Sequence, residues 1–97
     1  MSDMSDDELF MEELRQEFME SVAQNLKDLK SLLLENKMDE IRRIAHDIKG
    51  MAGTFDMEQG SEIAKHLQFA AENKEADKVA ELIEQLTTYM KNNGVAV

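Results

Sequence analysis

The sequence contains no cysteine and no proline, and it has only four glycines. Without cysteine, the chain can form neither a disulfide framework nor a thiolate metal site. Without proline and with few glycines, the composition favours helices throughout. No apolar run is long enough for a membrane span or the core of a signal peptide. We therefore expect a cytoplasmic protein without a membrane partner.

A glycine-rich phosphate-binding loop ending in Lys-Ser or Lys-Thr is also absent from the sequence. Ninety-seven residues leave no room for an ATP-binding kinase domain beside a helical bundle. We therefore expect one domain over residues 1–97, with residues 1–4 frayed and no independent enzymatic activity.

Basic residues are few: the chain has 11 of them against 21 acidic residues, a net charge of −10. Residues 1–40 carry 12 acidic and 4 basic side chains, a net −8, and residues 54–97 carry 8 and 4, a net −4. Only residues 41–53 are basic, with 3 basic and 1 acidic side chain. An acidic chain repels nucleic-acid backbones and resists random association. We therefore expect a monomer that does not bind nucleic acid.

Apolar residues recur at spacings of three and four in four segments, which is the pattern of amphipathic helices. The expected helices run from Ser5 to about Glu35, from Asp39 to Thr54 or Phe55, from Asp56 to about Ala71, and from about Glu75 to Asn92. Ser5, Asp39 and Asp56 are the predicted N-caps, since their side chains can accept hydrogen bonds from free helix amides. Gly94 suits the end of the last helix.

Each expected helix has one apolar face. On the first helix it consists of Phe10, Leu14, Phe18, Val22, Leu26, Leu29 and Leu33; on the third, of Ile63, Ala64, Leu67, Ala70 and Ala71; on the fourth, of Val79, Leu82, Ile83, Leu86 and Met90. The connections are short, so consecutive helices should be antiparallel neighbours. The predicted fold is an all-α, antiparallel, up-down-up-down four-helix bundle.

The second segment carries a histidine away from its apolar face. That face consists of Ile41, Ile44, Ala45, Ile48, Met51, Ala52 and Phe55. His46 lies about 200° around the helix axis from Ile44 and from Ile48, so its side chain should face solvent.

Four residues share the side of the helix on which His46 lies: Arg42, Lys49, Gly50 and Gly53. A glycine inside a helix costs about 1 kcal/mol relative to alanine, and two such residues leave the ring open to a large partner. Lys49 is one turn away, roughly 5–6 Å between Cβ atoms, and could contact an anion attached to the imidazole. The stripe indicates a histidine nucleophile, a cation for a phosphoryl group, and a docking face.

The segment Ala45–Gly53 resembles the signature of histidine-containing phosphotransfer (HPt) domains, His-x-x-Lys-Gly with an alanine before it and a further glycine after it. The resemblance extends over helices from about Leu9 to Tyr89. It departs from the family at Asp56, where a glycine is common.

The resemblance implies that Nε2 of His46 accepts a phosphoryl group from a sensor or hybrid histidine kinase, or from the aspartyl phosphate of a receiver domain. His46 would then pass the group to the aspartate of a response-regulator receiver. It implies no cofactor in this chain, because the receiver supplies Mg²⁺. It also implies that Gln68, on the next helix, accepts a hydrogen bond from the other ring nitrogen.

Two alternatives to a stand-alone phosphorelay protein are a helical bundle that binds a partner without carrying phosphate, and a phosphoacceptor domain excised from a larger hybrid or chemotaxis-type kinase. A metal site at His46 and His66 is disfavoured, because neither histidine has a glutamate three residues before it. The chain begins with methionine and lacks a linker, which favours the stand-alone protein.

Overall fold

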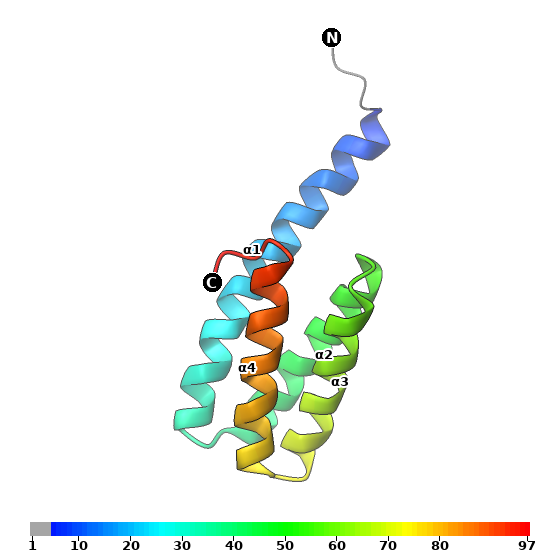
Figure 1. The fold of residues 1–97 in the computed structure, drawn as a ribbon. Coiled ribbons are helices and arrows are strands. Elements are labelled where there is room, and N and C mark those ends of the chain that lie inside the picture. Colours follow the sequence, from blue (N-terminus) through cyan, green and yellow to red (C-terminus); the bar gives the residue numbers. More distant parts are fainter. Residues whose placement is uncertain (1–4) are drawn as a thin grey trace.

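In the computed structural model, which describes residues 5–97, the chain forms four α-helices (Figure 1). They are α1 (Asp6–Leu34), α2 (Met38–Thr54), α3 (Glu58–Glu72) and α4 (Ala76–Asn92). The predicted fraying of residues 1–4 lies outside the described residues. None of the four helices is long and apolar enough to cross a membrane.

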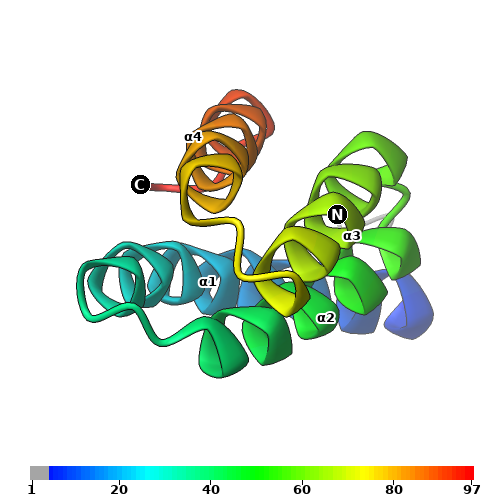
Figure 2. The same ribbon diagram turned by 90° about the horizontal axis from the view of Figure 1, so that it is seen from below.

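The helices follow one another around the bundle. α1 lies beside α2 and α4, and α3 lies beside the same two helices, so that each helix has two neighbours (Figure 2). Consecutive helices run in opposite directions (Figure 1). The prediction of an all-α, antiparallel, up-down-up-down four-helix bundle is therefore confirmed.

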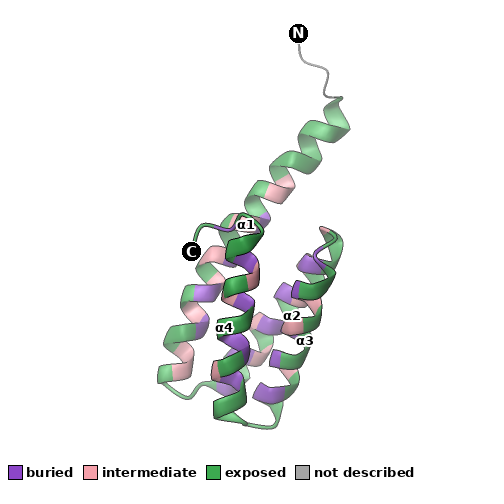
Figure 3. Ribbon diagram, in the orientation of Figure 1, coloured by how far each residue is buried: buried purple, intermediate pink, exposed green. Residues whose placement is uncertain are grey.

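One hydrophobic core lies between the helices, coloured purple in Figure 3. Its largest fully buried side chains are Leu26, Leu29, Ile41, Ile48, Leu67, Ile83, Leu86, Met90, Val22 and Val79. In the part of the chain that the structure describes, no polar or charged side chain is buried. Each buried apolar side chain therefore adds hydrophobic stabilisation, and no buried polar side chain adds a desolvation cost.

The first helix is longer than its neighbours, and the molecule measures 52 × 20 × 19 Å. The first buried residue of α1 is Phe18, whose ring stacks on Phe55 at a centroid distance of 5.0 Å. Phe10 was predicted to be in the core but is exposed, and Leu14 is only half-buried. This part of the prediction is wrong because the other helices end before the first turns of α1 (Figure 3).

All four helices end in the same backbone motif. The residue after each cap has a positive φ, and these residues are Asn36, Asp56, Lys74 and Gly94. The next amide then donates to a carbonyl five residues earlier, as in the 2.8 Å bond from Met57 N to Ala52 O. This is the Schellman motif, which satisfies carbonyls that the end of a helix leaves free.

These turns correct two predicted N-caps, Asp39 and Asp56. The N-caps of α2 and α3 are Lys37 and Met57, and neither makes a side-chain capping bond, whereas Ser5 Oγ does accept from Glu8 N at 3.2 Å. Asp56 ends α2 with φ of 60° rather than beginning α3. Aspartate tolerates this conformation better than most residues, although glycine adopts it without steric cost. The departure from the HPt signature therefore lies at a left-handed turn position.

Candidate functional site

His46 lies in the middle of α2 with its side chain exposed, while its neighbours Ala45 and Ile48 are buried in the core. A surface hollow borders the histidine on the α1 side. It is lined by Ser21 and Asn25 of α1 and by His46, Asp47, Gly50 and Met51 of α2. The hollow between α1 and α2 therefore lies directly beside His46, the candidate nucleophile.

The two glycines of the histidine stripe are not required by internal packing. A Cβ atom at Gly50 would find nothing within 4 Å. A Cβ atom at Gly53 would meet only Ser61 Oγ, at an ordinary contact distance of 3.8 Å. Both residues are exposed. The bundle would tolerate alanine at either position, so these glycines widen the open surface around His46.

Lys49 borders the histidine on the other flank, toward α3. Its carbonyl accepts a 2.9 Å hydrogen bond from Ser61 Oγ, which ties this turn of α2 to α3. The Lys49 side chain is half-buried, as is that of Arg42 one turn before His46. Among residues 5–97, neither side chain has a carboxylate within 4.0 Å. Both cations are therefore free to meet an anion from outside.

Gln68 lies on α3 but makes no hydrogen bond with His46 in the structure. Its Nε2 donates to Glu72 Oε1 at 3.4 Å, on the same helix. The Ser61–Lys49 bond fixes the register of the two antiparallel helices, and Gln68 follows Ser61 by seven residues. That places it on the side of α3 facing α2, about one turn below His46.

Three neighbours of the candidate site were not found from the sequence: Ser21, Asn25 and Ser61. Ser21 and Asn25 lie along the edge of the apolar face of α1 as a polar pair four residues apart, which was the available signal. Ser61 follows a glycine at the start of α3 and gives no comparable signal. Their positions beside α2 depend on how helices pack across the bundle, which periodicity does not specify.

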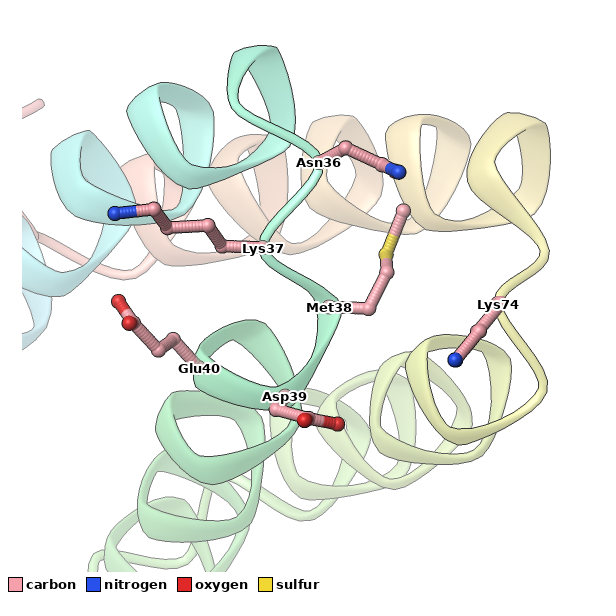
Figure 4. Close-up of a pocket in the computed structure, with 6 residues that line it drawn as sticks. All are labelled: Asn36, Lys37, Met38, Asp39, Glu40 and Lys74. Atoms are coloured by element: carbon pink, nitrogen blue, oxygen red, sulfur yellow. The ribbon is translucent and has the colours of Figure 1, made fainter.

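The second histidine lies apart from this site. His66 is an exposed residue of α3, with Nε2 3.9 Å from Glu62 Oε1. No three His, Asp or Glu side chains within residues 5–97 form a group that could hold a metal ion. Another hollow, formed by the α1–α2 turn with Lys74, includes no residue of the histidine stripe (Figure 4).

A matched pair of glycine substitutions tests which glycines serve packing. Gly50→Ala should raise the free energy of unfolding by about 1 kcal/mol, because alanine is the better helix former and the space is open. Gly60→Ala should lower it by about 1–3 kcal/mol, because its Cβ would lie 2.7 Å from Tyr89 Cε2. Urea unfolding followed by circular dichroism measures both. A loss of stability in Gly50→Ala would contradict the open surface at His46.

The family model described as "Hpt domain" matches residues 13–92, well over half of the chain. The match includes all of α2, α3 and α4 and most of α1. Searches among curated proteins and among solved structures each gave no match. The chain belongs to the Hpt domain family.

Proposed function

We propose that His46 is a phosphoacceptor in a phosphorelay. It receives a phosphoryl group from a sensor or hybrid histidine kinase, or from a receiver-domain aspartyl phosphate, and passes it to a response-regulator receiver aspartate. Family membership supports the general role of a phosphoryl carrier in phosphorelay signalling. The observation that carries the assignment to His46 is its exposed ring beside two glycines that packing does not require.

The transfer needs a neutral imidazole. The Nε2 lone pair attacks the phosphorus of the aspartyl phosphate, the P–N bond forms, and the bond from phosphorus to the aspartate oxygen breaks. The aspartate leaves as a carboxylate, and the phosphorylated ring can release its Nδ1 proton. Histidine suits this step because a neutral imidazole carries a free lone pair on one ring nitrogen while the other nitrogen holds the proton. Transfer to the next receiver is the reverse reaction: the receiver aspartate attacks the phosphorus, the P–O bond forms and the P–N bond breaks.

The other members of the stripe have supporting roles in this proposal. Lys49 offsets the charge of the phosphoryl oxygens, and Arg42 contributes to the basic docking face. Gly50 and Gly53 let the receiver approach the ring. Gln68 is a positioning residue: a change of rotamer away from Glu72 would let its Oε1 accept from Nδ1 and hold Nε2 free.

The chain acts in this proposal without an ATP site of its own, as a carrier rather than an independent enzyme. The receiver contributes the acidic pocket and Mg²⁺, and this chain contributes the nucleophile, the cation and the docking face. Hpt domains in general work with kinases and receiver domains, so both classes of partner are expected here.

The experiment that tests the proposal identifies the phosphorylated atom. The protein is labelled from a phosphorylated receiver of the source organism. One part of the labelled protein is then incubated in acid and another in base, and the label that remains is measured. We expect the label to be lost in acid and retained in base, as an N-linked phosphoryl group requires and an aspartyl phosphate does not. Acid-stable label on serine or threonine would overturn the mechanism. No label from any receiver or kinase would favour the helical bundle that never carries phosphate.

A further inference from the structure

Lys65 lies on the side of α3 that adjoins the histidine helix α2 (Figure 2). Ser61 Oγ donates to Lys49 O at 2.9 Å, and a Cβ atom added at Gly53 would lie 3.8 Å from the same oxygen. Lys65 follows Ser61 by four residues, so it continues the side of α3 on which these contacts are made. The next residue, His66, borders a hollow between α3 and α4 instead.

The contacts of Ser61 also set the level of Lys65 along α2. Ser61 lies beside the turn formed by residues 49–53, and four residues of helix rise by about 6 Å. Because the two helices are antiparallel, this rise leads toward the start of α2, to the turn formed by residues 45–49 (Figure 1). His46 belongs to that turn. Lys65 is therefore level with His46 on the neighbouring helix.

The ammonium group of Lys65 is within reach of a phosphoryl group on His46. Helices in contact have axes about 8–10 Å apart. Ala45 of α2 and Ala64 of α3 are small and fully buried, which favours a close approach of the two helices. A lysine carries its charge at the end of a flexible four-carbon stem, and the side chain of Lys65 is 45% exposed. It can therefore turn toward His46 without disturbing the core.

In the structure, a carboxylate of the same helix holds this ammonium group. Lys65 Nζ lies 3.9 Å from Glu62 Oε1, which is a long separation for an ion pair, and the side chain of Glu62 is 61% exposed. Such exposed pairs are weak, because water screens the charges and two flexible side chains must be ordered. A phosphoryl group offers three acceptor oxygens and more negative charge than one carboxylate. The ammonium group would therefore exchange Glu62 for a phosphoryl group on His46.

We propose that Lys65 is a second cation of the phosphoryl site and that Glu62 holds it until His46 is phosphorylated. This inference rests on the proposed function. Lys49 approaches the phosphoryl oxygens from α2 and Lys65 approaches them from α3, so that the group lies between two ammonium ions. No bond to Lys65 forms or breaks during the transfer. Its charge offsets the negative charge that is spread over the phosphoryl oxygens in the transition state.

An alternative role for Lys65 is attraction of an acidic receiver from a distance. Such attraction changes the rate of association and its dependence on salt. It does not change the rate of transfer within a complex that has already formed. Measurements at saturating receiver therefore separate a cation that contacts the phosphoryl group from one that only attracts the partner.

The test measures single-turnover transfer to each variant from a saturating phosphorylated receiver, the one that labels the wild-type protein fastest among those of the source organism. Lys65→Met removes the charge and keeps an unbranched stem, so we expect transfer to be about fivefold to tenfold slower. Lys65→Arg should recover much of the rate. The control is Lys78→Met, which removes an exposed lysine at the hollow between α3 and α4 and should leave the rate unchanged. Urea unfolding should show the same midpoint in all three variants, because both lysines are exposed.

Glu62→Gln tests the exchange of partners. It should speed transfer by about twofold to fivefold, because Lys65 is then available without breaking an ion pair. In the Lys65→Met background the same substitution should have no effect, so the two changes should be non-additive. The phosphorus NMR resonance of the isolated phosphorylated protein should move in Lys65→Met and stay in place in Lys78→Met, since only Lys65 contacts the phosphoryl oxygens.

Four results would overturn the inference, and they are distinguishable. A wild-type transfer rate in Lys65→Met, with normal labelling of His46, removes Lys65 from the site and leaves the proposed function standing. A higher Kd for the receiver with an unchanged rate at saturation assigns Lys65 to attraction of the partner. An equal effect of Glu62→Gln with and without Lys65 shows that Glu62 does not act through this lysine. Failure of every receiver to label the wild-type chain overturns both the inference and the proposed function.

Discussion

His46→Gln is expected to abolish phosphorylation by a cognate phosphorylated receiver while the bundle stays folded. The amide of glutamine has no lone pair that can act as the imidazole nitrogen does, so no P–N bond can form. The histidine side chain is exposed and makes no hydrogen bond within residues 5–97, so its loss should change the free energy of unfolding by less than about 0.5 kcal/mol. Radiolabel transfer and urea unfolding measure the two effects.

The matched control is His66→Gln, which replaces the other histidine of the chain. His66 is also exposed and lies beside Glu62 on α3, away from the histidine stripe of α2. This variant should be labelled at the wild-type rate. Labelling of His46→Gln equal to that of the wild type, with loss in His66→Gln, would move the phosphoacceptor to α3 and contradict the site proposed here.

The fold could be predicted from the sequence because the apolar residues of the short helices have few ways to be buried. Ile41, Ala45 and Ile48 recur at helical spacing and all lie in the core, as do Val79 and Leu86 on α4. The exposed position of His46 followed from the same periodicity, since a residue opposite an apolar face must meet solvent. The exposure of His46 was therefore predictable from its own helix, whereas the partial burial of Arg42 and Lys49 was not.

The errors arose where a property depends on two helices or on the backbone. Phe10 continues the apolar pattern of α1, but periodicity does not say where the neighbouring helices end. Asp56 has the chemistry of an N-cap and also tolerates a positive φ, and the structure uses the second property. The position of Ser21 beside the His46 hollow and the hydrogen bond from Ser61 to the Lys49 carbonyl depend on how the helices pack, which the sequence of one helix does not specify.

The roles of the three helical glycines could not be predicted from the sequence for a different reason. Gly50, Gly53 and Gly60 look alike in a helical sequence, where each weakens the helix. Only the packing separates them: Gly60 is buried under Tyr89, whereas Gly50 faces open space. Gly60 therefore allows the close contact between α3 and α4, and Gly50 leaves the surface around His46 open. The proposed role of Gly50 depends on this difference.

Lys49→Ala should slow phosphoryl transfer to His46 by about tenfold to a hundredfold. The ammonium group has no carboxylate within 4.0 Å among residues 5–97, so it is available to the phosphoryl oxygens. A charge-assisted contact of this kind contributes about 1–3 kcal/mol, which corresponds to that range of rates. Rapid-quench measurement of a single turnover, at saturating phosphorylated receiver, separates this effect from weaker docking.

The half-buried position of Lys49 requires variants that separate its charge from its packing. Lys49→Met keeps an unbranched apolar stem and removes the charge, so it should be as slow as Lys49→Ala. Lys49→Arg keeps the charge and should recover much of the rate. Lys78→Ala removes an exposed cation from α4, which does not adjoin α2, and should leave the rate unchanged. A wild-type rate in Lys49→Met would show that the charge does not assist transfer, because only the stem would then matter. The stabilisation of the transferring group would in that case come from the receiver and its Mg²⁺.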